Sequence, residues 1–130
     1  MDQKTKELNW LKGRKSHLSI ENKLLIYKTV IKPTWTYGIE LWGCASKSNI
    51  AIIQRAQSKI LRTIMNAPRY VSNRTLHTDL KTPYVTEVIR ENSTKYFSKL
   101  ENHSNPLLQP LLQPHQNRRL RRIWPTELRN

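Results

Sequence analysis

The sequence predicts an all-α protein, a small bundle of three to five helices followed by an extended, proline-rich and basic C-terminal tail. Apolar residues recur every three or four positions over long stretches, which is the spacing of one face of a helix. Alternating runs typical of strands are scarce, and the chain has only 3 Gly. A length of 130 residues suffices for one hydrophobic core.

The composition is strongly basic. Lys and Arg number 23 against 9 Asp and Glu, which gives a formal net charge of +14 and a pI near 10.4. A charge of this size usually serves a polyanionic partner, whereas solubility alone would be met as well by excess acid. No cationic segment has a clean amphipathic membrane face, so we expect a nucleic acid and not an anionic membrane as the partner.

Cysteine usage and the absence of long apolar runs indicate the compartment. Cys44 is the only cysteine, so no disulfide framework exists and a reducing compartment is expected. The first residues do not resemble a secretory signal, and no apolar run approaches the roughly 18–20 residues needed to cross a bilayer. We therefore expect an intracellular protein, cytoplasmic or nuclear, that is not secreted.

The N-terminal half is expected to form two helical segments. Residues 2–12 predict a short helix that Gly13 ends, followed by a basic turn. The stretch 19–43 is the central one, with Ser19 as N-cap. Its apolar stripe comprises Ile20, Leu24, Tyr27, Ile31, Trp35, Ile39 and Trp42.

Pro33 lies in the middle of this stripe without changing its phase. Proline lacks the N–H that would bond one turn back, so the sequence predicts either one bent helix or two helices with Pro33 in the first turn of the second. Gly38 is expected to lie inside the buried helix, where it would let another backbone approach closely.

The segment 50–65 predicts a second strong helix. Ser46 or Ser48 is its expected N-cap, and residues 66–68 end it. Its basic side chains Arg55, Lys59 and Arg62 follow at i, i+4 and i+7 and therefore line one face. An ordinary solvated face is the commoner meaning of such charges, but no acid occurs between Glu40 and Asp79, which favours contact with phosphate.

The next residues predict a loop, a short helix and a last long helix. Ser72 or Asn73 is expected to cap the short helix, and Thr82 the long one, with Pro83 at its first position. The residues expected to face inward from the long helix are Val85, Val88, Ile89, Tyr96, Phe97 and Leu100.

The character of the sequence changes after residue 104. Pro106, Pro110 and Pro114 are spaced four apart, which favours an extended linker. The run RRLRRIWP follows, a basic cluster with the aromatic Trp124. Such a cluster fits phosphate contact with base stacking, a nuclear-import signal, or a disordered tail.

The sequence has no group of residues with the spacing that catalysis or metal binding needs. A two-metal phosphoryl-transfer site needs converging carboxylates, but the only aspartates are Asp2 and Asp79. The four histidines are scattered without metal-ligand spacing, and one cysteine cannot form a zinc knuckle. His77, near Asp79, is expected to cap a helix or lie on the surface. We predict no catalytic residue, no metal and no cofactor in this chain.

Three segments together resemble a known family. The runs KPTWTYGIELWG, IIQRAQSKILR and NAPRYVSN look like the C-terminal part of the reverse transcriptase of jockey-type non-LTR retrotransposons, over residues 10–100 and more loosely beyond. The resemblance implies a helical thumb that holds a template–primer duplex against a palm domain. Arg69 departs from the bulky aromatic expected there, which would loosen the loop. The palm aspartates, which would bind Mg²⁺ in the full polymerase, are absent from this chain.

The residue patterns and the resemblance together lead to predictions of the domains and of the site residues. We expect an N-terminal helix and basic turn at 1–18, a thumb-like domain at 19–103 and the linker and tail at 104–130. The residues predicted to contact nucleic acid are Lys23, Lys28, Lys32, Arg55, Lys59, Arg62, Arg118, Arg119, Arg121 and Arg122. The residues predicted to pack the core are Ile31, Trp35, Tyr37, Trp42, Ile53, Ile60 and Ile64.

Two hypotheses about partners and one without a partner follow. The chain binds an RNA–DNA hybrid or another duplex without a catalytic site of its own. Alternatively, it is an orphaned helical module whose apolar surface binds the missing palm domain or another protein. The third hypothesis is a degenerate reading frame with no selected function.

Overall fold

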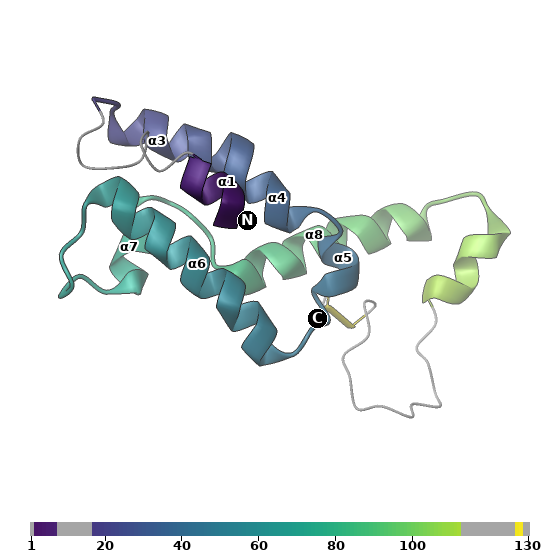
Figure 1. Cartoon of the computed structure of the whole chain (residues 1–130). Coiled ribbons are helices and arrows are strands. Elements are labelled where there is room, and N and C mark those ends of the chain that lie inside the picture. Colours follow the sequence, from purple (N-terminus) through teal and green to yellow (C-terminus); the bar gives the residue numbers. More distant parts are fainter. Residues whose placement is uncertain (1, 8–16, 113–126, 129–130) are drawn as a thin grey trace. The chain divides into compact units, whose positions relative to one another are not determined.

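The computed structural model describes residues 2–7, 17–112 and 127–128, and these residues are helices joined by short turns (Figure 1). No strand occurs among them, which confirms the all-α prediction. The elements are α1 (Asp2–Glu7), α3 (Ile20–Ile26), the π-helix η1 (Tyr27–Ile31), α4 (Lys32–Thr36), α5 (Ile39–Trp42), α6 (Lys47–Met65), α7 (Asn73–Asp79), α8 (Val85–Glu101) and the 3₁₀ helix η2 (Pro106–Leu112).

The contacts of the chain group it into two compact units. Unit 1 consists of residues 1–37 and 51–84, and unit 2 of residues 38–50 and 85–130. The first turn of α6 therefore belongs to unit 2 and the rest of that helix to unit 1. The division into 1–18, 19–103 and 104–130 that the sequence suggested stays a prediction.

The central stretch is two helices joined through a π-helical turn. Ser19 is the N-cap of α3, as predicted, and its hydroxyl accepts a hydrogen bond from the Asn22 amide at 3.3 Å. Pro33 occupies the first turn of α4, where its missing N–H is tolerated. The π-helical turn ends with the Lys32 amide donating to the Tyr27 carbonyl, five residues back. The apolar residues on both sides of Pro33 therefore stay on one face of the chain.

The helix ends at Tyr37, so the prediction of a continuous helix to Gly43 is wrong. Tyr37 is extended (ψ 125°) and Gly38 is left-handed (φ 64°). No heavy atom lies within 4 Å of a Cβ built on Gly38, so this glycine supplies a backbone conformation and not a close approach. Tyr37 is 88% exposed, which contradicts its predicted place in the core.

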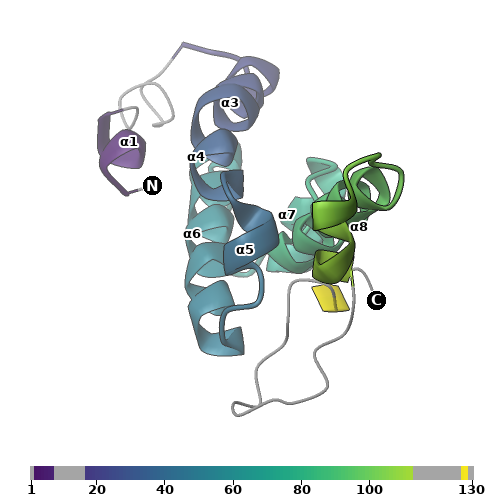
Figure 2. The same ribbon diagram turned by 90° about the vertical axis from the view of Figure 1, so that its right-hand side faces the viewer.

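The core of unit 1 lies where α3 and η1 run alongside α6 (Figure 2). The buried cluster consists of Tyr27, Ile31, Ile60, Leu61, Ile64 and Leu80. The predicted core residues Ile31, Ile60, Ile64 and Trp35 are indeed buried, whereas Ile53 and Trp42 are half-buried. Burial raises the pKa of the Tyr27 phenol above its usual range, and the side chains of Gln57 and Trp35 partly offset this rise.

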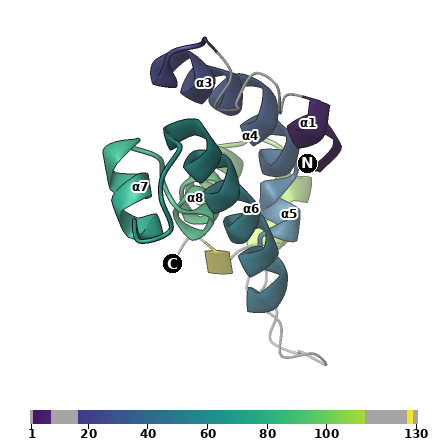
Figure 3. The same ribbon diagram turned by 60° about the vertical axis from the view of Figure 1, so that its left-hand side comes forward.

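Helix α7 lies beside α6 in unit 1 (Figure 3), and a buried histidine joins the two. His77 Nδ1 lies 2.8 Å from the Thr82 carbonyl oxygen, to which it donates, and Nε2 lies 3.0 Å from Gln54 Nε2. The ring stacks on Tyr84 with centroids 4.1 Å apart. The prediction of a capping or surface histidine is therefore wrong.

The caps of the later helices agree with the predictions in part. Ser46 and Ser72 accept hydrogen bonds from the amides of Asn49 and Thr75, at 3.4 and 3.2 Å, and so cap α6 and α7. Helix α8 begins at Val85, so Thr82 and Pro83 precede it and do not start it as predicted. The Thr82 hydroxyl donates instead to the Leu80 carbonyl at 3.2 Å.

In unit 2, α5 and η2 both contact α8. The apolar residues predicted to face inward from α8 are buried, except Tyr96, which is 40% exposed. A Cβ on Gly43 would lie 2.6 Å from the Ile39 carbonyl oxygen and 2.8 Å from Ile89 Cγ2, so only glycine fits there. Residues 106–112 form a 3₁₀ helix and not the extended linker that their prolines suggested.

Candidate nucleic-acid interface

The predicted basic face of α6 is divided between surface and structural roles. Arg55 and Lys59, one turn apart, are exposed. Neither side chain makes a hydrogen bond or ion pair with the residues that the structure describes. These two cations are therefore available to an external anion.

Arg62, the third member of that face, is instead engaged within unit 1. Its Nε and Nη2 donate to Asn73 Oδ1 at 3.1 and 2.9 Å. Its Nη1 donates to the Pro68 carbonyl at 3.2 Å, and its Nη2 also donates to the Val71 carbonyl. Most of the guanidinium donors are thus used to hold the α6–α7 loop against both helices. Arg62 therefore positions this loop, and its contact with phosphate stays a prediction.

The loop that Arg62 holds contains a tight turn. The Val71 amide donates to the Pro68 carbonyl at 3.2 Å, which places Arg69 and Tyr70 at the two central positions of a β-turn. Both central side chains are exposed, and Tyr70 is 89% exposed. Arg62 donates to the carbonyls at both ends of this turn, and the loosening expected from Arg69 stays a prediction.

The α6–α7 region presents more exposed cations than the predicted set contained. Arg69 in the turn and Arg74 on α7 are exposed, and no acid occurs between Glu40 and Asp79. The same acid-free stretch continues beyond α6 to Asp79, so this sequence signal includes both arginines as well.

The remaining predicted basic residues have different environments. Lys28 is exposed and Lys32 is half-buried, both in unit 1. Lys23 is only 7% exposed, and its contact with nucleic acid stays a prediction. The four arginines of the tail, Arg118, Arg119, Arg121 and Arg122, lie outside the described residues.

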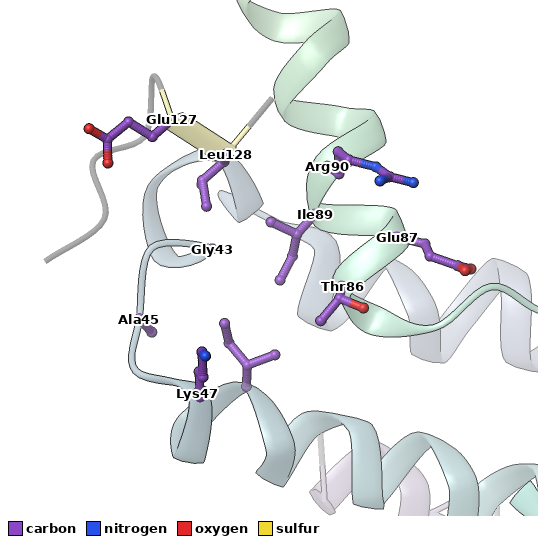
Figure 4. A pocket seen from close by; sticks show the side chains of 10 residues that line it. Gly43, Ala45, Lys47, Thr86, Glu87, Ile89, Arg90, Glu127 and Leu128 are labelled. Carbon is purple, nitrogen blue, oxygen red and sulfur yellow. The ribbon is translucent and has the colours of Figure 1, made fainter. Parts of the chain in front are cut away.

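Unit 2 contains a cavity of about 470 Å³ that no sequence pattern predicted (Figure 4). Leu128 and Ile89 point toward Gly43 in it, and its rim carries both basic and acidic side chains. The charged residues are Lys47, Arg90, Glu87 and Glu127. Because both charge signs are present, the cavity has no electrostatic preference for a polyanion.

Neither a metal site nor a membrane-spanning helix is found in the described part of the chain. No three His, Cys, Asp or Glu residues within it are grouped as metal ligands. The helices of these residues are also too short or too polar to cross a bilayer.

These features define a class of protein: a basic, all-helical segment that exposes cationic side chains from helices and a hydrogen-bonded loop. Comparison with known proteins gives its descent. The chain is 42% identical over 119 residues to "Probable RNA-directed DNA polymerase from transposon X-element" of Drosophila melanogaster, which covers 92% of this chain and 13% of that protein. It is 37% identical over 105 residues to "RNA-directed DNA polymerase from mobile element jockey" of Drosophila funebris, 81% of this chain and 12% of that protein.

The chain therefore shares descent with one segment of the RNA-directed DNA polymerases of jockey and related non-LTR transposons. It spans only about an eighth of the length of those relatives. No family model and no solved structure matches it. The resemblance stated from the sequence is thereby confirmed at the level of the family.

Proposed function

We propose that unit 1 binds the phosphate backbone of a template–primer duplex, such as an RNA–DNA hybrid, as the thumb-like part of a reverse transcriptase. The single observation that carries this proposal is the acid-free stretch 41–78, which exposes Arg55, Lys59, Arg69 and Arg74 without partners among the described residues. The names of the relatives support a nucleic-acid partner.

Phosphate contact is the form of recognition that copying requires. A polymerase must accept any template sequence, so contacts to phosphate and sugar serve it and contacts to base edges do not. We propose further that the chain has no catalytic site of its own and that the carboxylates and Mg²⁺ of the reaction belong to a palm domain, with which it would work.

The test is the salt dependence of binding to a blunt RNA–DNA hybrid. Each phosphate neutralised contributes a slope of about 0.9 in log affinity against log salt. The double variant Arg55→Glu and Lys59→Glu should weaken binding and lower that slope by about 2, one contact for each side chain. The matched control is Lys95→Glu with Lys99→Glu on α8 in unit 2, which changes the net charge equally.

Two results would overturn the proposal. One is an absence of binding to the hybrid at low salt. The other is an equal loss of affinity in the two double variants, because net charge and not the α6 surface would then determine binding.

Exposed apolar side chains of unit 1 favour a second candidate, a protein-interaction module. Leu25 is 58% exposed and Ile52 is 59% exposed. If these side chains served protein contact, light scattering would show self-association or complex formation that persists at high salt, and Leu25→Ser or Ile52→Ser would abolish it. Association that disappears with salt would favour the nucleic-acid proposal.

A further inference from the structure

The turn at residues 68–71 presents one aromatic side chain on a fixed support. Tyr70 is 89% exposed, and its side chain makes no hydrogen bond and no ring contact with the other described residues. The residue occupies a central position of a β-turn closed by the 3.2 Å hydrogen bond from the Val71 amide to the Pro68 carbonyl. A ring this exposed contributes little to the core and is accessible to an external partner.

Arg62 is what fixes the turn. Its guanidinium donates to the carbonyl oxygens at both ends, Pro68 and Val71, and also to Asn73 Oδ1 on α7. The turn is thus bonded to α6 and α7 at once. A side chain presented from such a framework loses little backbone freedom on binding, which improves affinity without any additional contact.

The charges around the ring narrow the class of partner. Arg69 precedes Tyr70 directly, Arg74 follows in the first turn of α7, and no acid occurs between Glu40 and Asp79. An exposed aromatic flanked by cations suits a nucleotide, whose base offers a flat face and whose phosphate offers negative charge. A base inside a duplex is covered by its neighbours on both faces, whereas an unpaired base of a single strand can expose a face to a surface residue.

We infer that Tyr70 stacks on an unpaired base of a single strand next to the duplex, while Arg69 and Arg74 contact the phosphates of that strand. The inference rests on the proposed function, to which it adds a single-strand contact. Stacking is tolerant of sequence because every base has a π-face, so it is compatible with copying any template.

The test uses the full chain and three ligands with the same duplex: a blunt RNA–DNA hybrid, the hybrid with a short single-stranded overhang, and the hybrid with an abasic overhang of equal length. The abasic strand retains the phosphates and lacks the bases. The wild type should bind the normal overhang about 5- to 150-fold more tightly than the abasic one, the range expected for stacking one base.

Substitutions at Tyr70 should affect this difference alone. Tyr70→Ala should remove the preference for the normal overhang and leave the affinity for the blunt hybrid unchanged. Tyr70→Phe should retain the preference, since stacking needs the ring and not the hydroxyl. Because the side chain is exposed, these variants should unfold at the temperature of the wild type.

The failures of the two proposals are distinguishable. If Tyr70→Ala binds all three ligands as the wild type does, stacking is overturned whatever the salt slope shows. If the blunt hybrid is not bound at low salt while the base-dependent preference persists and needs Tyr70, the duplex proposal fails and stacking stands.

Discussion

The two units differ in how acidic side chains are distributed among their basic ones, in a chain whose net charge is +14. In unit 2, basic residues have acidic neighbours: Lys95 pairs with Glu91 at 2.6 Å, and the cavity rim carries both signs. In unit 1, the α6–α7 region has exposed cations and no acid at all before Asp79. Local absence of acid, more than total charge, indicates the surface for a polyanion.

Unit 1 also shows that cations on one helix face need not share a role. Arg55 and Lys59 extend from the surface, whereas Arg62 on the same face bonds to the loop and to α7. The planar guanidinium suits this structural position, because its five N–H donors form a fixed fork that here reaches three acceptors.

The largest expected effect tests this contrast. Arg62→Ala should lower the free energy of unfolding by about 2–3 kcal/mol, since it removes the donors to Asn73 Oδ1 and to the Val71 carbonyl and one of the two donors to the Pro68 carbonyl. Arg55→Ala should change it by less than about 0.5 kcal/mol. Urea denaturation followed by circular dichroism measures both. Equal effects of the two substitutions would show that Arg62 is merely another surface cation.

The second prediction compares the two glycines on either side of α5. Gly43→Ala should destabilise unit 2 by about 1–3 kcal/mol, because the Cβ would overlap the Ile39 carbonyl and Ile89. Gly38→Ala should lower the free energy of unfolding by about 1 kcal/mol, because alanine is strained in the left-handed backbone conformation that Gly38 adopts.

Asparagine separates the two causes in the same denaturation experiment. It tolerates left-handed backbone, so Gly38→Asn should recover part of the stability that Gly38→Ala loses, while Gly43→Asn should be at least as harmful as Gly43→Ala. Recovery at both positions would mean that packing in unit 2 is looser than the structure indicates.

The third prediction concerns the buried core of unit 1. The pKa of Tyr27 is raised by burial, so above about pH 10 the unfolded chain loses this proton before the folded chain does. Stability from this group is complete below that pH and falls as pH rises further, by at most about 1.4 kcal/mol per pH unit.

Tyr27→Phe removes the titrating group and should remove that part of the decline. Denaturation of both proteins between neutral and alkaline pH measures it, and the difference between their curves cancels the other tyrosines and the lysines. Parallel curves up to alkaline pH would contradict the assignment.

The sequence predicted the helices because apolar periodicity and serine caps act locally: Ser19, Ser46 and Ser72 cap their helices through their own hydroxyls. It could not predict that the helix breaks at Gly38, since Ile39 and Trp42 continue the apolar period and only the backbone conformation reveals the break. Nor could it separate Arg62 from Arg55, because their partners are set by the path of the loop and not by spacing. His77 was misread for the same reason.

The smallest expected effect concerns the left-handed residues of unit 1, where the two helix ends differ. Asn66 follows α6 with φ 50°, and Lys81 follows α7 with φ 48°. Asparagine adopts this conformation more readily than lysine does, because its short polar side chain can bond to the local backbone. Lys81→Gly should therefore raise the free energy of unfolding by about 0.5–1 kcal/mol, and Asn66→Gly by less. If thermal denaturation shows no gain for Lys81→Gly, the entropy that glycine adds to the unfolded chain has cancelled the relief of strain, and the α7 terminus is not a weak point of unit 1.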